Sequence, residues 1–501
     1  ETDLGVPQNR QTESIETSGL NAEIIYAAGG NALIIFKSRS LAVEFTRILS
    51  KKVLLEAPGI NLLVAHADFD WNNDNLYEIV ENLKKNEIEQ QKYERIPSNP
   101  LLSLSVNASC NSTQLPAIDT SEKHINYGED EEARGYLISN ETKQKLEAVH
   151  RANQELQTKL GVDNNIYQFP YRIDYLGRSE GESSYIAVVH IDGNDMGNRF
   201  KQHGEDKENR EYINAIREFS DSVDAAGLNA LKAVTENLVN SILEGKLLGR
   251  FGEIELNTIN RKSNICYLPF RPLVYAGDDI TFICDGRLGL ELAALFLEKF
   301  AEQKVADNQP LTACAGVCIV KTHYPFARAY KVSEDLCRTA KKFVKEEREK
   351  QVIDYFSAID WHLAASGLLG SISEIRQREY EVIEKEENWD LVMRPLWLNQ
   401  KDEWRTWSGF TQVLTEFKQG KNWKGRKNKI MALREVLRRG SIEAVEEFLL
   451  SYKLPNLPLF PESSGKNEQL KQQGWINKKC GYFDAIEAID FYLGIGGEVK
   501  S

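Results

Sequence analysis

The sequence predicts an α+β fold in which one order of strands and helices occurs twice and is followed by a helical C-terminal domain. Three observations predict it. Two glycine-containing hairpin patterns, at residues 24–36 and 273–284, are each followed by a helix, a strand and a second helix. A nearly continuous apolar run at residues 184–191 precedes the second hairpin, as expected of a strand buried on both faces. Beyond residue 365, spaced apolar positions and several tryptophans indicate packed helices.

The first copy starts at the hairpin of residues 24–36, which turns at a Gly-Gly pair. Its later elements are a helix at 40–52, a strand at 61–69 and a helix at 76–85. The strand and helix that should precede the hairpin are absent from the sequence, and there is no initiator Met. We therefore expect a degenerate, N-terminally incomplete copy and a sequence that begins part-way into a longer chain.

The second copy is complete. Its strand, helix, hairpin, helix and strand form the β-α-β-β-α-β split motif of the ferredoxin-like fold, with one further helix after it. In chain order, the elements are expected at residues 184–191, 212–244, 273–284, 288–303, 311–320 and 327–345.

Four domains follow from this organisation. Residues 1–90 form the first, degenerate ferredoxin-like domain, and residues 91–180 form a largely polar connecting module with one long helix at 142–160. Residues 181–365 form the second ferredoxin-like domain, and residues 366–501 form the helical C-terminal domain.

Composition excludes several classes of protein. At about 150 residues per domain, 501 residues correspond to three or four units. No run approaches the roughly 20 apolar residues of a membrane span, and the first residues do not resemble a signal peptide, so we expect a cytoplasmic protein without a membrane partner. The net charge of −13 disfavours nucleic-acid binding by the whole surface. The seven scattered cysteines form no C-x-x-C pair, so neither a zinc finger nor a disulfide scaffold is indicated.

Three carboxylates are expected to meet at one end of the second ferredoxin-like sheet. Asp192 ends the buried strand, whereas Asp278 and Asp279 occupy the hairpin tip, which lies beside that strand end in this fold. Carboxylates this close repel one another unless a cation lies between them, and Mg²⁺ (or Mn²⁺) prefers such oxygen ligands. Asp192, Ile191, Asp278 and Asp279 are therefore the candidate metal ligands.

A metal site of this kind suits the joining of nucleotides. Two Mg²⁺ ions about 3.5 to 4 Å apart lower the pKa of an attacking 3′-hydroxyl and stabilise charge on a leaving pyrophosphate. Asp278 and Asp279 are the candidate catalytic residues. Lys341, preferred over Lys342, is placed on the last helix of the copy to bind the triphosphate. The candidate nucleotide-binding residues are Gly193, Gly197, Ala276, Gly277 and Lys341.

Simpler interpretations compete with each of these assignments. A lone Gly-Asp-Asp is commonly a polar turn, but here it accompanies a strand-end carboxylate, a repeat and a helix lysine. Asp195 serves equally well as an acidic residue at a helix N-terminus. His190, within the apolar run, is interpreted as a hydrogen-bonded core residue rather than a base.

The motif residues resemble a known family. Residues 192–197 read Asp-Gly-Asn-Asp-Met-Gly, residues 276–279 read Ala-Gly-Asp-Asp, and residues 340–341 read Ala-Lys. This pattern is similar to the large catalytic subunit of type III CRISPR effector complexes, which makes cyclic oligoadenylates. The resemblance implies two palm domains, the first degenerate like the Gly-Gly-Asn-Ala tip at residues 29–32. It also implies ATP as substrate and other subunits and guide RNA as partners.

The chain departs from the family pattern at several places. Asn194 replaces a carboxylate, and Ala276 replaces the first glycine of the Gly-Gly-Asp-Asp hairpin. Cys110 looks like a remnant of the family's zinc-binding insertion, but its partner cysteines are gone, so no zinc is expected. No His-Asp dipeptide occurs, so DNase activity is not expected.

Three functions remain in view. The leading hypothesis is a metal-dependent nucleotidyl cyclase that converts ATP into a cyclic oligoadenylate-type signal for antiviral defence. The alternative is a catalytically weak scaffold or nucleotide-binding subunit of a CRISPR ribonucleoprotein. There, a basic stretch would contact RNA or a protein partner, although a solvated surface explains this stretch equally well: Lys418, Lys421, Lys424, Arg426, Lys427 and Lys429. A diguanylate-cyclase-like enzyme ranks last, because its hairpin normally reads Gly-Gly-Asp/Glu-Glu-Phe.

Overall fold

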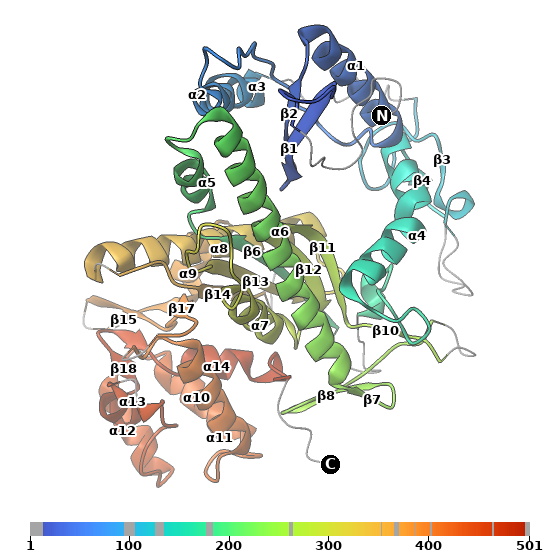
Figure 1. Cartoon of the computed structure of the whole chain (residues 1–501). Coiled ribbons are helices and arrows are strands. Elements are labelled where there is room, and N and C mark those ends of the chain that lie inside the picture. Colours follow the sequence, from blue (N-terminus) through green and yellow to red (C-terminus); the bar gives the residue numbers. More distant parts are fainter. Residues whose placement is uncertain are drawn as a thin grey trace. The chain divides into compact units, whose positions relative to one another are not determined.

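The computed structural model forms two compact units (Figure 1). The first contains the chain up to residue 161 together with residues 197–222, and the second contains residues 162–196, 223–259 and the chain from 263 onward. The structure describes residues 14–94, 106–125, 135–176, 184–259, 264–351, 353–364, 370–384, 386–400, 403–462 and 465–495.

The first unit begins with the predicted hairpin. Strands β1 (Ala22–Ala28) and β2 (Asn31–Phe36) pair antiparallel. Gly29 and Gly30 between them have φ angles of 59° and 72°, a combination typical of type I′ hairpin turns that glycine adopts without steric cost. The helices that follow are α1 (Arg39–Glu56), α2 (Leu76–Asn82), the π-helical segment η1 (Leu83–Ile88) and α3 (Glu89–Glu94).

The predicted strand at residues 61–69 is wrong: this segment has no regular secondary structure. In the split motif the last strand pairs with the first strand of the same copy. The described part of the first unit contains no such first strand, so the backbone of residues 61–69 has no ladder to join. The side chains of this segment are half-buried or exposed, so its apolar pattern marked neither a buried core segment nor a paired strand.

The rest of the first unit includes the connecting module. The predicted long helix is present as α4 (Asn140–Leu160), which begins after the capping residue Ser139. Cys110 is buried within hydrogen-bonding distance of the hydroxyls of Ser112 and Thr142. The other elements are β3 (Asp119–Thr120), η2 (Ser121–Lys123), β4 (Leu137–Ile138) and α5 (Met196–Gly204).

A six-stranded sheet is the centre of the second unit. Its strand order is β11-β12-β6-β13-β14-β17. Each of the first four strands is antiparallel to its neighbour, and their order is that of the ferredoxin-like split motif, which confirms the predicted α+β palm fold. The strands are β6 (Tyr185–Gly193), β11 (Phe270–Ala276), β12 (Asp279–Asp285), β13 (Ala313–Lys321), β14 (Ala358–Leu363) and β17 (Leu396–Trp397).

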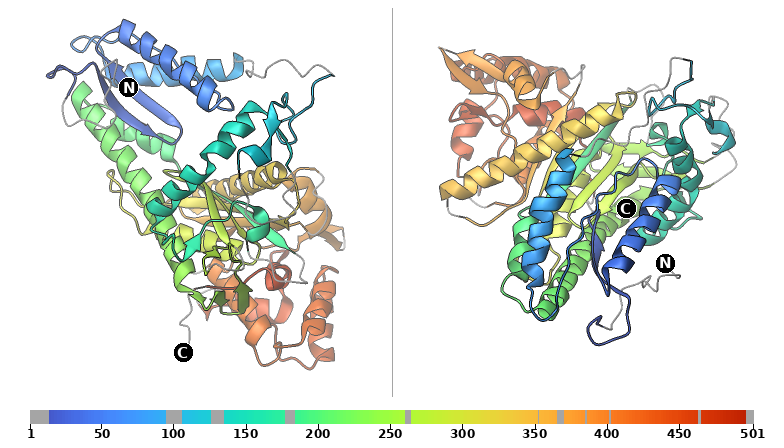
Figure 2. Two further views of the ribbon diagram at one scale, coloured as in Figure 1. Left: turned by 90° about the vertical axis from the view of Figure 1, so that its right-hand side faces the viewer. Right: turned by 90° about the horizontal axis from the view of Figure 1, so that it is seen from above.

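Two helices cover opposite faces of this sheet. A Cβ on Gly289, in α7 (Gly289–Ala301), would lie 2.3 Å from the Cβ of Ala187 in β6. A Cβ on Gly316, in β13, would lie 2.1 Å from the carbonyl oxygen of Ser333 in α8 (Phe326–Gln351). Because side chains alternate along a strand, the odd-numbered residues of β6 face α7 and the even-numbered ones face α8. Figure 2 shows α8 lying across the strands.

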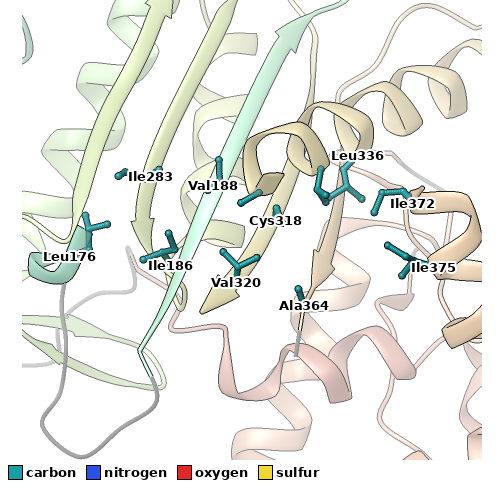
Figure 3. Close-up of a cluster of buried hydrophobic side chains, with 12 residues drawn as sticks. Leu176, Ile186, Val188, Ile283, Cys318, Val320, Leu336, Ala364, Ile372 and Ile375 are labelled. Atoms are coloured by element: carbon teal, nitrogen blue, oxygen red, sulfur yellow. The ribbon is translucent and has the colours of Figure 1, made fainter. Parts of the chain in front are cut away.

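The face under α8 is largely apolar. Val188, Cys318 and Leu336 belong to a buried cluster there that joins the two central strands to the helix (Figure 3). The cluster extends to Ile372 and Ile375 of α9 (Ile372–Tyr380), so the chain beyond the palm packs on the same core. This apolar face ends at Asp192, where the candidate site begins.

The C-terminal region is mainly helical, as predicted, and its tryptophans Trp397, Trp404, Trp407 and Trp423 are buried. It also contains short strands that the sequence did not predict, and one of them, β17, extends the palm sheet. The helices are α10 (Trp407–Gln419), α11 (Lys427–Leu437), α12 (Ile442–Ser451), α13 (Asn467–Gln473), α14 (Phe483–Glu487) and η5 (Ala488–Asp490). The short strands are β15 (Glu381–Glu384), β16 (Glu387–Asp390), β18 (Trp475–Ile476) and β19 (Lys479–Cys480).

Smaller elements complete the second unit. Helix α6 (Asn209–Asn240) continues from the first unit into the second and leads to a three-stranded sheet. The remaining elements are β5 (Tyr167–Gln168), η3 (Ile173–Tyr175), β7 (Ile242–Leu243), β8 (Lys246–Gly249), β9 (Gly252–Glu255) and β10 (Cys266–Tyr267). None of the helices among the described residues has the length and apolar character needed to cross a membrane.

Candidate active site

The register of the sheet places Asp192 beside the hairpin tip. In β6, His190 and Ile191 lie opposite Thr281 and Ile280 of β12. One step further along the same register, Asp192 reaches the level of Asp279, the first residue of β12. The carboxylates of the strand end and of the hairpin therefore lie at the same edge of the sheet.

Asp278 packs directly on the strand end. A Cβ on Gly193 would lie 2.7 Å from both the Cβ and the Oδ2 of Asp278, which is closer than real Cβ contacts. Only glycine, which has no Cβ, fits at position 193 without this clash. The structure thus brings Gly193, which the sequence placed in the nucleotide site, into contact with one of the two candidate catalytic carboxylates.

The hairpin turn requires glycine at one position only. Among residues 276–279, only Gly277 has a positive φ, 66°, as at the first central position of a type II′ turn. Ala276 is the last residue of β11 and pairs with Asp279. The replacement of the family's first glycine by Ala276 is therefore compatible with the turn. Helix α6 closes over it, since a Cβ on Gly227 would lie 1.8 Å from the carbonyl oxygen of Gly277.

Lys341 reaches the site from α8. Its Nζ lies 2.5 Å from Oδ2 of Asp192 and donates a hydrogen bond to the carbonyl oxygen of Gly193 at 2.8 Å. The neighbouring Lys342 is exposed and lies 3.7 Å from Glu346 on the solvent side. Of the two lysines weighed from the sequence, Lys341 is the one at the carboxylates.

The carboxylates destabilise one another's charged forms. Burial, and then the charge of Asp192, raise the pKa of Asp278 to about 6, although Lys341 acts in the opposite direction. Burial and Asp192 also raise the pKa of Asp279, whereas His190 lowers it. A positive charge in addition to Lys341 would stabilise this cluster.

The donor set fits a hard divalent cation whose ligands come only partly from protein side chains. Within the part of the chain that the structure describes, no group of three or more His, Cys, Asp or Glu side chains is arranged to hold a metal by itself. However, Oδ1 of Asp279 is buried without a hydrogen-bond partner. The side chain of Ile191 is a hydrocarbon with no donor atom, so only its carbonyl oxygen could serve as a ligand. Mg²⁺ commonly takes one or two carboxylates and completes its shell with water and phosphate oxygens.

The residues after Gly193 do not join the carboxylate group. Asn194 is 4% exposed and uses its side chain in hydrogen bonds to Thr312 and Phe356. Asp195 has a φ of 60°, and its charge, after burial, raises the pKa of Tyr355. Gly197 is the second residue of α5, where a Cβ would meet nothing within 4 Å.

Three residues near the site were not assigned to it from the sequence. Nδ1 of His190 lies 3.1 Å from Oγ1 of Thr281, which agrees with a hydrogen-bonded role, but it also lies 3.7 Å from Oδ1 of Asp279. The ring of Tyr330 meets that of His190 edge-on, and the charge of Glu334 raises the pKa of Asp279. Tyr330, Glu334 and Lys341 are spaced four and seven residues apart, the period of one helix face, which was the available signal.

Residues 185–351 match the family model of the Cas10/Cmr2 second palm domain. The chain contains a Cas10-like palm. The resemblance predicted from the motif residues is thereby confirmed, and the matched segment runs from β6 to the end of α8, including Asp192, Asp278, Asp279 and Lys341. No curated protein matches the chain.

Several solved structures are similar to parts of the chain. Csm1 of T. onnurineus has 12% identity and a TM-score of 0.42, with 94% of this chain and 62% of that chain covered. A Csm1–Csm4 cassette in complex with cA4 has 13% identity and a TM-score of 0.33, covering 62% of this chain. The GGEEF domain of a Vibrio cholerae diguanylate cyclase has 17% identity and a TM-score of 0.19, covering 32% of this chain and 78% of that one. The chain spans 37% of the cassette chain it matches.

The basic stretch considered for RNA contact is partly used within the fold. Lys418 donates to the carbonyl oxygen of Tyr492, Lys427 pairs with Asp490, and Lys429 is 8% exposed and donates to Asn422. The cations of the stretch that remain exposed at the loop before α11 are Lys421, Lys424 and Arg426.

Proposed function

We propose that this protein is a metal-dependent nucleotidyl cyclase that joins ATP into a cyclic oligoadenylate-type second messenger, with release of pyrophosphate, in CRISPR-type antiviral defence. One observation carries the proposal. The end of β6, with Asp192 and Gly193, meets the Asp278–Asp279 hairpin tip at the place where Lys341 arrives from α8. The match of this segment to a Cas10/Cmr2 palm supports the same chemistry.

The acidic and basic residues of the site would have different roles. Asp192, Asp278 and Asp279, with the carbonyl oxygen of Ile191, would hold Mg²⁺ or Mn²⁺, which supplies positive charge to the attacking 3′-hydroxyl and the leaving pyrophosphate. Lys341 would bind triphosphate oxygens and, on doing so, give up its contact with Asp192. The backbone at residues 276–277 and at Gly193 and Gly197 would lie along the phosphates.

The proposed setting is a cytoplasmic effector complex. On the basis of the Cas10-like palm, we expect other subunits of a type III CRISPR-like complex and guide RNA as partners. The exposed cations Lys421, Lys424 and Arg426 are the surface we would test first for contact with phosphates, because binding through them should weaken steeply with salt.

Product analysis tests the proposal. Purified protein, alone and with its partner subunits, guide and target RNA, is incubated with ATP and Mg²⁺ or Mn²⁺, and the products are separated by liquid chromatography with mass detection. We expect cyclic oligoadenylates and stoichiometric pyrophosphate. Asp278→Asn and Asp279→Asn should each reduce formation by at least about a hundredfold, the scale of losing a charge-stabilising group. Asp335→Asn serves as the matched control, since Asp335 pairs with Arg338 and Lys331 on α8.

Absence of product and of pyrophosphate in the complete complex would contradict the cyclase proposal. It would favour the second candidate, a nucleotide-binding scaffold subunit. Two observations support that candidate: Lys341 is engaged by Asp192, and Asn194 supplies no carboxylate. Calorimetry would then detect ATP binding that survives Asp278→Asn.

A further inference from the structure

Asn194 occupies a tightly defined polar pocket beside the carboxylate site. Its Nδ2 donates to Oγ1 of Thr312 and to the carbonyl oxygen of Phe356, each at 3.0 Å. Its Oδ1 accepts from Sγ of Cys314 at 3.3 Å. Its backbone N–H donates to the carbonyl oxygen of Thr312 at 2.9 Å. Both amide N–H groups and the amide oxygen are therefore used, two residues after Asp192.

These contacts require an amide. A carboxylate has no N–H to donate, so an aspartate at position 194 would place negative charge against the carbonyl oxygen of Phe356 in a site that is 4% exposed. Leaving such buried groups unsatisfied costs about 1 to 3 kcal/mol, and more for a charged group. The departure from the family's carboxylate is thus matched by the surroundings of the residue.

Phe356 leads from this pocket to the C-terminal region. Its ring stacks on that of Trp397 in β17, with centroids 3.5 Å apart and planes 17° apart. The ring of Phe343 from α8 meets both of them edge-on, at 5.7 and 5.6 Å. Trp397 is 2% exposed and pairs through its backbone with Ala358 of β14. A continuous set of contacts therefore runs from Asn194 through Phe356 to Trp397.

We infer that Asn194 is a positioning residue that fixes the Asp192 end of β6 by tying it to Phe356, and that the carboxylate site thereby depends on how the C-terminal region packs on Trp397. The inference rests on the proposed metal-dependent function and adds a residue and a dependence to it. Functional groups must be held within about 0.5 Å to work, and a 1 Å displacement can cost about a hundredfold in rate. Releasing the tether should therefore weaken metal binding before it unfolds the protein.

Mn²⁺ binding tests the inference without relying on activity. The affinity of the full chain for Mn²⁺ is measured by calorimetry and by electron paramagnetic resonance for wild type, Asn194→Asp, Asn194→Ala and Phe356→Leu. We expect the two Asn194 variants to bind Mn²⁺ at least about tenfold more weakly, a 1.4 kcal/mol change. Tighter binding by Asn194→Asp would overturn the inference, because position 194 would then be adding a metal ligand; unchanged binding by both variants would overturn it too.

Phe356→Leu isolates the second step. It keeps the backbone carbonyl that accepts from Asn194 but removes the stack on Trp397. We expect Mn²⁺ affinity to fall severalfold. Unchanged affinity would contradict the inferred dependence of the site on the C-terminal region. Asn153→Asp is the matched control: Asn153 is a fully buried asparagine in α4, in the other unit. This control should lose thermal stability with no change in Mn²⁺ affinity.

A metal-free measurement separates the inference from the proposed function. Hydrogen exchange of the amides in residues 185–196 should be faster in Asn194→Asp than in wild type, and in Asn153→Asp it should not change. If wild type fails to bind Mn²⁺, the proposed metal-dependent function is wrong. The exchange result still shows whether Asn194 holds the end of β6. Equal exchange in wild type and Asn194→Asp would overturn it.

Discussion

Nζ of Lys341 lies 2.5 Å from Oδ2 of Asp192, so a lysine of the last palm helix neutralises the carboxylate that ends the first palm strand. The same ammonium group donates to the carbonyl oxygen of Gly193. In the proposed function, triphosphate oxygens compete with Asp192 for Lys341, and a divalent cation competes with Lys341 for Asp192. The pair therefore links metal binding and nucleotide binding through a single side chain.

Replacing Lys341 should separate the two binding steps. In Lys341→Met, we expect ATP affinity to fall at least about tenfold, because the cation for the triphosphate is lost. Mn²⁺ affinity without ATP should instead rise severalfold, because the competing ammonium is gone. Calorimetry with each ligand measures both effects. Lys342→Met is the matched control, since Lys342 is exposed and pairs with Glu346 at the surface. A decrease in Mn²⁺ affinity in Lys341→Met alone would contradict the competition.

A methyl group on Gly193 should open the site. In Gly193→Ala, the new Cβ would lie 2.7 Å from Cβ and Oδ2 of Asp278, so the hairpin tip must move. We expect a loss of about 1 to 3 kcal/mol in stability, typical of overpacking, and a loss of at least about a hundredfold in product formation. Gly19→Ala, in the first unit, where a Cβ meets nothing within 4 Å, should change neither. Equal activity of the two variants would exclude the close approach of Gly193 and Asp278.

A buried carboxylate should stabilise the first unit at neutral pH. Burial disfavours ionised Glu23, but hydrogen bonds from Arg210 and Arg217 outweigh it and hold its pKa at about 2. Because this pKa is depressed, the stabilisation is present above about pH 4.5 and is lost as the pH falls towards 2. Glu23→Gln should therefore cost about 3 kcal/mol at pH 7 and less at pH 3.

Urea unfolding of wild type and Glu23→Gln at both pH values measures this difference. The control is Glu44→Gln, because Glu44 makes a comparable pair with Arg47 at the surface. It should leave the midpoint close to that of wild type. If Glu23→Gln lowered the free energy of unfolding equally at pH 3 and pH 7, packing and not the charge of Glu23 would be responsible.

At Glu291 we expect the opposite dependence of stability on pH. Burial raises the pKa of this carboxyl to about 7, although the hydroxyl of Tyr492 donates a hydrogen bond to it. For a raised carboxyl pKa, the stabilising protonated form is lost as the pH rises through 7, so wild type loses stability between about pH 4.5 and 7. Glu291→Gln should be more stable than wild type at pH 8, by up to about 3 kcal/mol, and should lose this advantage at pH 5.

Thermal unfolding at pH 5 and pH 8 measures the effect of Glu291→Gln. Glu302→Gln, at an exposed carboxylate that pairs with Lys299, is the control and should behave like wild type at both values. A stability advantage at pH 5 as large as that at pH 8 would rule out ionisation of Glu291 as its cause.

Much of the palm could be predicted because its signals are local. The apolar run that becomes β6, the glycines that give the positive φ angles at residues 29, 30 and 277, and the helix periods are all visible in short windows of sequence. The prediction of a strand at residues 61–69 was wrong because strand formation does not depend on local signals alone. Its apolar pattern is local, but a strand also needs a partner, and no neighbouring sequence reveals whether one is present.

The candidate site shows the same division. Asp192, Asp278 and Lys341 could be selected because the order of elements in a split βαβ motif dictates which strand ends are neighbours. Glu334 could not be placed with them, because its position depends on how α8 lies across the sheet. The close contact of Gly316 with Ser333 sets that position, and it joins residues far apart in the chain.

By itself, the sequence determined the α+β palm, its strand order and the meeting of Asp192 with the hairpin tip, because hydrophobic periodicity and turn residues act over a few neighbouring positions. Only the tertiary structure decided that Lys341 pairs with Asp192, that Asn194 binds Phe356, and that β14 and β17 extend the sheet. Those features depend on side-chain directions and on pairing between distant segments. They become defined only when the two faces of the sheet are buried.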